Sequence, residues 1–131
     1  YRDKIYAQEI KSKSQEIFGN KFIDLNNFID LNEYIKLLSK IDIAIFNHER
    51  QQAFNSIITL IGLGKKVYLN PSSPIIETLN EYKVCFFTTD NINLDPLDNI
   101  NAKKNIDRIK KLFSKEILIK NLDYIFNSKE Y

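Results

Sequence analysis

The sequence predicts an α/β protein, with a parallel sheet of about four strands and helices on both faces. Two observations lead to this fold class. Short apolar segments alternate along the chain with amphipathic segments of helical period. The 131 residues, 44% hydrophobic and 27% charged, suffice for the core of one domain and are too few for two. We therefore expect residues 1–131 to form a single domain.

The N-terminal part is expected to hold a helix followed by a short strand. Apolar side chains recur at helical spacing over residues 3–18. Gly19 follows them and ends the helix, because glycine readily adopts the left-handed conformation of a helix C-terminus. Residues 22–25 are predicted to form the strand.

A capping box opens the next helix. Asp30 is a good N-cap residue, and Glu33 follows three residues later, as this motif requires. The helix is expected to run to about Lys40. Residues 41–46 then form a strand that is apolar apart from Asp42, which is typical of a parallel strand covered on both faces.

The remaining elements complete the alternation of helices and strands. A largely apolar helix is expected over residues 51–64, a strand over 66–69, a short helix over 74–82 and a strand over 84–88. A helical tail, 96–131, follows and is expected to hold two helices, 97–113 and 115–127. Gly62 and Gly64 close the first of these helices, so they indicate a helix C-terminus and close packing rather than a phosphate loop.

Composition excludes several classes of function. Nineteen basic and seventeen acidic residues give a net charge of +2, so we expect no nucleic-acid partner. The single cysteine, Cys85, is expected to be buried and inert, and no metal site or cofactor is predicted. No apolar run approaches the roughly 18 residues of a membrane span. Without a Gly-x-Gly-x-x-Gly or Walker motif, dinucleotide chemistry (an epimerase or dehydrogenase) and P-loop chemistry are disfavoured.

Polar residues follow each predicted strand. They occupy positions 26–27, 47–51, 70–73 and 88–90. In open parallel sheets, ligands bind beyond the carboxyl ends of the strands. The contrast between apolar strands and polar strand ends therefore predicts a ligand site at this edge of the sheet.

The densest polar segment precedes the helix predicted over residues 51–64. Its candidate ligand-binding side chains are His48, Glu49, Arg50, Gln51 and Gln52, with Asn55 expected one turn inside the helix. A helix N-terminus favours an anion such as a phosphate, and Arg50 could add a bidentate contact. Two interpretations stay open: a phosphate-binding turn, or a solvated loop in which Glu49 and Arg50 pair. His48 could act as a general base, a ligand contact or a structural hydrogen-bonding group.

The helical tail is basic between Lys103 and Lys120, with seven basic and two acidic residues. An apolar stripe runs through the same segment and includes Ile106, Ile109 and Phe113. Two interpretations stay open here too. The tail could lie on an anionic membrane surface, or it could pack on the core and leave a solvated lysine face.

Five stretches of the chain lie in register with one known family. They are Tyr6-Ala7-Gln8-Glu9-Ile10, residues 34–46, Arg50-Gln51-Gln52-Ala53, residues 60–70 and Phe86-Phe87-Thr88-Thr89-Asp90. On these stretches, residues 1 to about 95 resemble the C-terminal part of the bacterial 4-acetamido-4,6-dideoxygalactose (Fuc4NAc) transferases of glycosyltransferase family 56. Two departures stand out: Ala53 replaces the glycine of the family's Arg-Gln-Gln-Gly motif, and the loop 70–74 differs.

The resemblance implies a GT-B architecture of two facing Rossmann-like domains, of which this chain would be the donor-binding C-terminal half. The chain begins with Tyr1, and an N-terminal acceptor domain with the general base is expected upstream. The implied reaction is inverting and metal-independent. It transfers the sugar of dTDP-Fuc4NAc, a nucleotide-sugar substrate, to a polyprenyl-diphosphate-linked saccharide in enterobacterial common antigen synthesis. The implied location is the bacterial cytoplasm, at the periphery of the inner membrane.

The resemblance also implies roles for individual residues. Arg50, Gln51, Gln52 and Asn55 would contact the diphosphate or sugar, and Asn70 the nucleotide. The chain alone would bind the donor weakly and catalyse nothing. An alternative hypothesis is a non-enzymatic flavodoxin-like interaction or regulatory module, although the acidic residues Asp24 and Asp90 are too scattered to suggest a receiver.

Overall fold

The computed structural model describes residues 4–25 and 27–127 in two compact units, Tyr1–Tyr34 and Ile35–Tyr131. The first unit contains helix α1 (Lys4–Phe18), which confirms the first predicted helix. A 3-10 turn, Gly19–Lys21, follows it, and Gly19 has the left-handed φ of +53° that ends the helix. None of the residues Lys4–Phe18 is buried. Some predicted positions lie outside the described ranges: Asp3 of the first helix, Asn26 of the first polar segment, and residues 128–131 of the tail.

The prediction of a strand over residues 22–25 was wrong. These residues form no strand, and Ile23 and Leu25 are 74% and 51% exposed. An ion pair of 3.0 Å between Lys11 Nζ and Asp24 Oδ2 joins the segment to α1 instead. A strand requires hydrogen bonds to a neighbouring strand, and the apolar pattern alone does not supply that neighbour.

Helix α2 (Leu31–Lys40) begins where the capping box predicts. The Asp30 carboxylate accepts hydrogen bonds from the backbone amides of Asn32 (2.8 Å) and Glu33 (3.1 Å). These bonds satisfy two amides that lack partners within the helix. Helix α2 contains the boundary between the two units.

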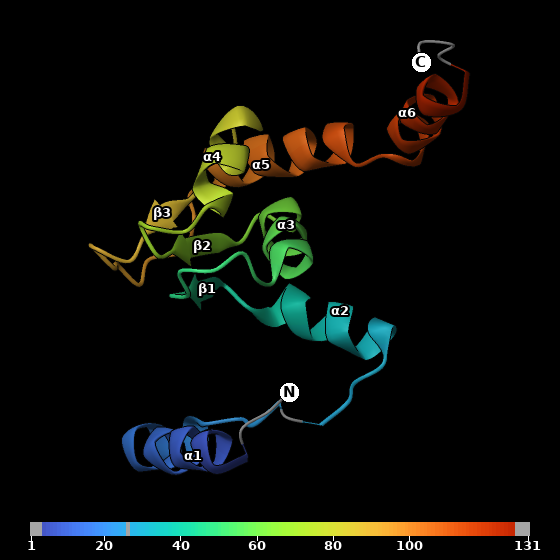
Figure 1. Cartoon of the computed structure of the whole chain (residues 1–131). Coiled ribbons are helices and arrows are strands. Elements are labelled where there is room, and N and C mark those ends of the chain that lie inside the picture. Colours follow the sequence, from blue (N-terminus) through green and yellow to red (C-terminus); the bar gives the residue numbers. More distant parts are fainter. Residues whose placement is uncertain (1–3, 26, 128–131) are drawn as a thin grey trace. The chain divides into compact units, whose positions relative to one another are not determined.

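The second unit holds a parallel sheet of three strands in the order β1-β2-β3 (Figure 1). The strands are β1 (Ile43–Phe46), β2 (Lys66–Leu69) and β3 (Phe87–Thr88). Helices flank the sheet, so the predicted Rossmann-like α/β fold is confirmed. The sheet has three strands among the described residues rather than about four.

Strand β3 is shorter than the segment 84–88 predicted for it, because a side chain takes the place of a neighbouring strand. The Asn105 amide accepts from the Cys85 backbone N–H (2.7 Å) and donates to the Cys85 carbonyl (2.8 Å). Both backbone groups of Cys85 are therefore satisfied outside the sheet. The Cys85 side chain is half-buried, less than the predicted full burial, and desolvation raises the pKa of its thiol, which disfavours the reactive thiolate.

Helix α3 (Phe54–Gly62) connects β1 to β2 and ends in a Schellman motif. Gly64 has a φ of +72°, its amide donates to the Ile61 carbonyl (3.0 Å), and the Lys65 amide donates to the Leu60 carbonyl (3.0 Å). The glycines thus confirm the predicted helix C-terminus. The helix begins three residues later than predicted.

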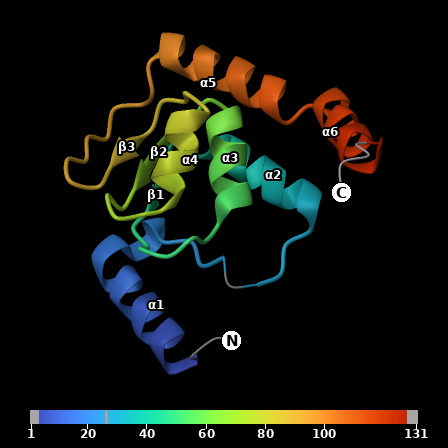
Figure 2. The same ribbon diagram turned by 45° about the horizontal axis from the view of Figure 1, so that its top comes forward.

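Helices α4 (Ile75–Glu81), α5 (Asn99–Leu112) and α6 (Lys115–Asn127) confirm the last three predicted helices. Helix α5 packs against α3 (Figure 2). A Cβ atom on Gly62 would lie 2.9 Å from Ile109 Cγ2, and one on Gly64 would lie 3.1 Å from Ile106 Cδ1. The predicted packing role of both glycines is therefore confirmed. None of the helices in the described ranges has the length and apolarity that a bilayer crossing needs.

Strand β2 is buried along its whole length, and Lys66 and Tyr68 lie on the same face of it. On this face, the Lys66 ammonium donates to the Asn93 carbonyl (3.2 Å), to Asn93 Oδ1 (3.1 Å) and to the Asp95 carbonyl (2.9 Å). The Tyr68 hydroxyl donates to the Asn93 carbonyl (2.7 Å) and accepts from the Asn93 amide (2.9 Å). We call Lys66, Tyr68, Asn93 and Asp95 the Lys66 cluster. It fixes the segment after β3 against the sheet.

Candidate site at the carboxyl edge of the sheet

The polar residues after the three strands lie side by side. The Asn70 amide donates to the Phe46 carbonyl (3.0 Å), and the Thr89 amide donates to the Leu69 carbonyl (2.9 Å), so the strand pairing continues one residue beyond the strands. Asn47 Oδ1 accepts from Asn70 Nδ2 (3.2 Å) and from Thr89 Oγ1 (3.0 Å). The side chains that follow β1, β2 and β3 thus form one hydrogen-bonded network.

The turn after β2 holds Asn70 in place. Asn70 Oδ1 accepts from the Ser72 amide (2.8 Å), and the Asn70 carbonyl accepts from the Ser73 amide (2.9 Å). Ser73 is 3% exposed, and its hydroxyl has no hydrogen-bond partner in the described part of the chain. A buried hydroxyl without a partner is uncommon, and it marks this turn as a place that a ligand could complete.

His48 presents a second polar atom without a partner. Its Nδ1 lies 2.9 Å from the Arg50 carbonyl oxygen. Because a carbonyl can only accept, we infer that Nδ1 carries the proton, which leaves Nε2 of the neutral ring as an acceptor. Nε2 is buried and has no partner among the described residues. The ring packs edge-on against Phe46 at 5.9 Å between centroids, so its orientation is fixed.

The N-terminus of α3 follows the His48 loop and carries no side-chain cap. Ala53 occupies the N-cap position in the left-handed conformation, with φ 57° and ψ 23°. Glycine adopts this conformation without steric cost, which explains physically why a glycine would suit position 53. The helix dipole, together with amides that no capping side chain covers, favours an anion at this position.

The other predicted site residues are exposed side chains around this helix end. Glu49, Arg50, Gln51 and Gln52 lie in the loop before α3, and Asn55 lies in its first turn rather than one turn inside. Arg50 and Glu49 do not form an ion pair with each other. The loop side chains are therefore available to a ligand.

Sequence reasoning did not single out three residues that the structure brings to this edge. Asn47, Ser73 and Thr89 follow predicted strands, and Asn47 also belongs to the densest polar segment, but the sequence suggests no role for them. Their position after a strand was the sequence signal that could have identified them. In contrast to the side chains of the loop before α3, those of Asn47 and Thr89 are fixed by hydrogen bonds. We call Asn47, His48, Asn70, Ser73 and Thr89, with the N-terminus of α3, the carboxyl-edge site.

The fixed groups of the carboxyl-edge site are suited to hydrogen bonding with a ligand. These groups are amides, hydroxyls and one imidazole, which recognise hydroxyl and phosphate groups. Two carboxylates lie near this edge. Glu49 is exposed in the loop before α3, and Asp90 Oδ2 accepts from Thr88 Oγ1 (3.3 Å). No cluster of three His, Cys, Asp or Glu side chains arranged for a metal occurs in the described ranges.

Comparison with known proteins gives one match. Residues 1–127 match the family model described as 4-alpha-L-fucosyltransferase, glycosyl transferase group 56. No curated protein and no solved structure matches the chain. The matched residues include the first unit, the second unit up to residue 127, and every element named above. The chain therefore belongs to glycosyl transferase group 56 and is a glycosyltransferase of that family.

Proposed function

We propose that this chain is the donor-binding domain of a GT-B glycosyltransferase. It would transfer Fuc4NAc from dTDP-Fuc4NAc to a polyprenyl-diphosphate-linked acceptor, in the synthesis of a surface glycan such as enterobacterial common antigen. One observation carries the proposal: Asn47, Asn70 and Thr89 converge at the carboxyl edge of a parallel sheet, the position at which such sheets bind nucleotides. Membership of a glycosyltransferase family supports it.

The proposed donor pose follows from the chemistry of the edge. The diphosphate would lie at the N-terminus of α3, where Arg50 can neutralise its charge without a metal ion. Gln51, Gln52 and Asn55 would reach the sugar, and Asn70 the nucleotide. The unpartnered His48 Nε2 would accept a hydrogen bond from a hydroxyl group of the bound nucleotide sugar. Glu49 would line the same side of the site.

The proposal assigns the other half of the reaction to residues outside this chain. An N-terminal domain would bind the acceptor and supply the general base for an inverting transfer. The polyprenyl chain of the acceptor is a membrane lipid, so the reaction would take place on the cytoplasmic side of the inner membrane, with the enzyme bound peripherally. The chain alone would bind the donor and catalyse nothing.

A nucleotide titration tests the donor site directly. The thermal midpoint of the chain would be measured with increasing dTDP, UDP and GDP, because a ligand that binds the folded state raises stability with its concentration. We expect dTDP to give the largest rise. If none of the three nucleotides raised the thermal midpoint, the proposal would be overturned and a non-enzymatic module would be favoured.

A substitution at His48 separates ligand binding from folding. Asn at this position can still donate to the Arg50 carbonyl, but it has no atom at the place of Nε2. We expect His48→Asn to keep the stability of the chain and to weaken dTDP binding about ten-fold. His48→Gln is the matched variant, because its longer amide can replace Nε2, and it should bind more tightly than His48→Asn. Equal dTDP affinity of His48→Asn and the wild type would contradict the role of Nε2.

Arg50→Ala tests the diphosphate contact in the full-length enzyme. Arg50 is exposed and unpaired within the described chain, so we expect unchanged stability. The kcat/KM should fall by about 100-fold or more, because a charge-assisted contact to the diphosphate is lost. The exposed Lys40 of α2 offers a control, and Lys40→Ala should leave transfer unchanged. An unchanged kcat/KM in Arg50→Ala would refute the site assignment.

A further inference from the structure

A cluster of cations lies between α4 and α5. Lys83, Lys104, Arg108 and Lys111 line a hollow of about 270 Å³, with Asp107 as the acidic residue among them. All five side chains are exposed. None of the four cations forms an ion pair with a described carboxylate. We call these four residues the cationic cluster, and it carries an excess of positive charge that the described chain leaves unpaired.

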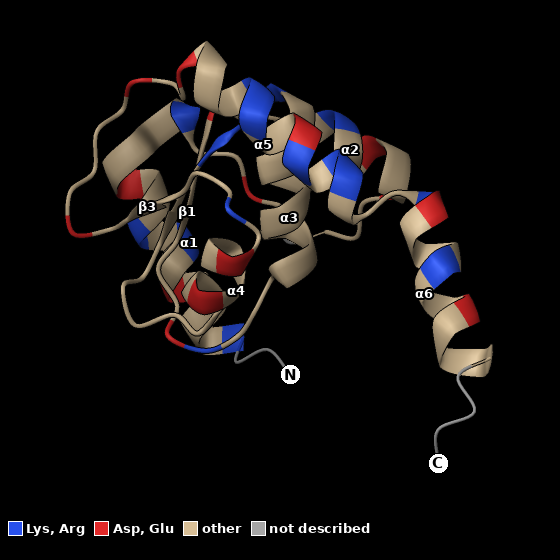
Figure 3. Ribbon diagram, turned by 90° about the horizontal axis from the view of Figure 1, so that it is seen from above, with Lys and Arg blue, Asp and Glu red and all other residues tan. Residues whose placement is uncertain are grey.

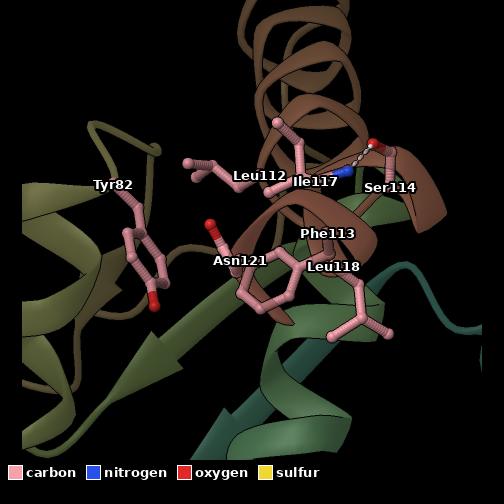
Figure 4. Close-up of a pocket in the computed structure, with 7 residues that line it drawn as sticks. All are labelled: Tyr82, Leu112, Phe113, Ser114, Ile117, Leu118 and Asn121. Atoms are coloured by element: carbon pink, nitrogen blue, oxygen red, sulfur yellow. Dashed lines mark hydrogen bonds between the residues drawn. The ribbon is translucent and has the colours of Figure 1, made fainter. Parts of the chain in front are cut away.

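An apolar pocket adjoins the cationic cluster. It has a volume of about 470 Å³ and lies where α5 meets α6 (Figure 4). Tyr82 lines one side and Phe113, Ile117 and Leu118 another, with the Tyr82 and Phe113 rings 5.7 Å apart in an edge-to-face contact. Tyr82 directly precedes Lys83 and Leu112 directly follows Lys111, so residues that line the two hollows are neighbours in the chain at two places.

Helix α6 extends this apolar surface. None of the residues Lys115–Asn127 is buried, and Leu118, Leu122 and Phe126 are 59%, 42% and 80% exposed. Their spacing of four residues places them on one face of the helix. Figure 1 shows α6 at the end of α5 away from the sheet. Its apolar face therefore points to surroundings outside the described core.

The two tail helices differ in how far they pack on the core. Asn105 and Ile109 of α5 are buried, whereas its lysines are exposed, so α5 fits the interpretation of a core-packed helix with a solvated lysine face. Figure 3 shows how basic residues recur along α5. Helix α6 has no such buried residue. The apolar face of α6 beside the basic face of α5 is the combination that an anionic interface accommodates.

This surface lies at the other edge of the sheet from the carboxyl-edge site. Lys83 follows the C-terminus of α4 and precedes β3, which places the cationic cluster near the amino ends of the strands. The carboxyl-edge site follows the other ends of the same strands. A partner on α5 and α6 would thus leave the carboxyl-edge site open.

We propose that the cationic cluster and the apolar face of α6 dock together on an anionic phospholipid leaflet. The four cations would meet the phosphate headgroups, and Leu118, Leu122 and Phe126 would enter the boundary between headgroups and acyl chains. Unpaired cations beside exposed apolar residues argue for this occupant, because lipid offers both complementary groups on one surface. The inference rests on the proposed function in one respect, that the acceptor is a membrane lipid.

Vesicle co-sedimentation tests the docking surface. The chain would be mixed with vesicles of phosphatidylcholine alone or of equimolar phosphatidylcholine and phosphatidylglycerol. We expect binding to the anionic vesicles that weakens as salt is raised. Neutralising two cations in Lys104→Gln/Arg108→Gln should weaken it about 30-fold. The matched control, Lys36→Gln/Lys40→Gln on α2, removes the same charge elsewhere and should leave binding within about two-fold.

The apolar contribution is tested in the same assay. Leu122→Ser/Phe126→Ser should weaken vesicle binding about ten-fold or more, since two apolar side chains no longer enter the interface. Ile92→Ser/Leu94→Ser is the control, because these residues are exposed outside α5 and α6. Circular dichroism would confirm that each variant is folded.

Three outcomes would overturn the docking surface. The first is that the wild-type protein stays in the supernatant with anionic vesicles. The second is that Lys104→Gln/Arg108→Gln and its control lose vesicle binding to the same extent. The third is a dimer in analytical ultracentrifugation that Leu122→Ser/Phe126→Ser dissociates while vesicle binding persists, which would assign the apolar face to a second copy. Failure here leaves the nucleotide titration unaffected, so the two proposals fail separately.

Discussion

Two polar regions of the same sheet differ in how completely their buried groups are paired. In the Lys66 cluster, the ammonium of Lys66, which is 5% exposed, donates to three oxygens, and the Tyr68 hydroxyl both donates and accepts. At the carboxyl-edge site, the Ser73 hydroxyl and His48 Nε2 are buried without a partner in the described chain. The same sheet thus carries a fully hydrogen-bonded cluster on one face and, beyond the ends of its strands, a site with two buried polar atoms that lack hydrogen-bond partners in the described chain.

The difference is the one expected between a structural cluster and the proposed binding site. Buried polar groups in native proteins are nearly always hydrogen-bonded, and an unpaired one costs free energy. In the Lys66 cluster, hydrogen bonds within the fold offset the free-energy cost of burying the ammonium group. Under the proposed function, the carboxyl-edge site would recover this cost when a ligand supplies the missing partners. Substitutions in the two regions should therefore change the stability of the free protein in opposite directions.

Lys66→Met should give the largest effect. Methionine keeps the apolar stem of the side chain but removes three hydrogen bonds, and the Asn93 and Asp95 oxygens lose their donor. The ammonium also lies 5.0 Å from the centroid of the Phe87 ring and 5.4 Å from that of Tyr68, contacts that are lost as well. We expect a loss of about 3 kcal/mol in the free energy of unfolding, measured by urea denaturation.

Lys40→Met is the control for this measurement. Lys40 is exposed on α2, so its substitution should change the free energy of unfolding by less than about 0.5 kcal/mol. If Lys66→Met were no more destabilising than Lys40→Met, the Lys66 cluster would not stabilise the fold.

Ser73→Ala should have a smaller effect of the opposite sign. The substitution removes a buried hydroxyl that lacks a partner and leaves the backbone bond from the Ser73 amide to Asn70 intact. We expect the free energy of unfolding of the unliganded protein to rise by about 1 kcal/mol. Saturating dTDP should reduce this advantage if the hydroxyl binds the nucleotide.

The neighbouring serine provides the comparison. Ser72 is exposed, and Ser72→Ala should change the free energy of unfolding by less than about 0.5 kcal/mol. A destabilisation by Ser73→Ala would show instead that its hydroxyl is satisfied in solution, and the contrast between the two regions would disappear.

Local signals predicted much of the fold. Helical periodicity and the Asp30 cap gave the helices, and alternation with short apolar segments gave the parallel sheet. The errors came from contacts that no local pattern encodes. Residue 85 lies in an apolar run, yet Asn105, twenty residues later in the chain, bonds its backbone groups and shortens β3. The start of α3 shifted because Ala53 adopts a left-handed conformation that alanine rarely takes.

The candidate site was predictable in place but not in detail. Parallel strands end at a common edge, so the polar residues after them were expected together. Which side chains bond one another depends on the register of β1, β2 and β3, and this register made Asn47 the shared acceptor. The exposed residues from Glu49 to Gln52 remain predictions that a ligand must test.

Asp98→Ala should have the smallest effect and depends on pH. Asp98 caps α5, and its carboxylate accepts from the Asn101 backbone amide (2.9 Å) and side-chain amide (2.8 Å). The backbone bond above all lowers the pKa of Asp98. A carboxyl group whose pKa is lower in the folded state stabilises the fold above its unfolded pKa, and this contribution disappears as pH falls through the folded pKa. The variant should therefore be slightly less stable than the wild type at neutral pH, and the difference should shrink in acid. Parallel stability curves of Asp98→Ala and the wild type across this range, measured by urea denaturation, would mean that the exposed cap adds no pH-dependent stability.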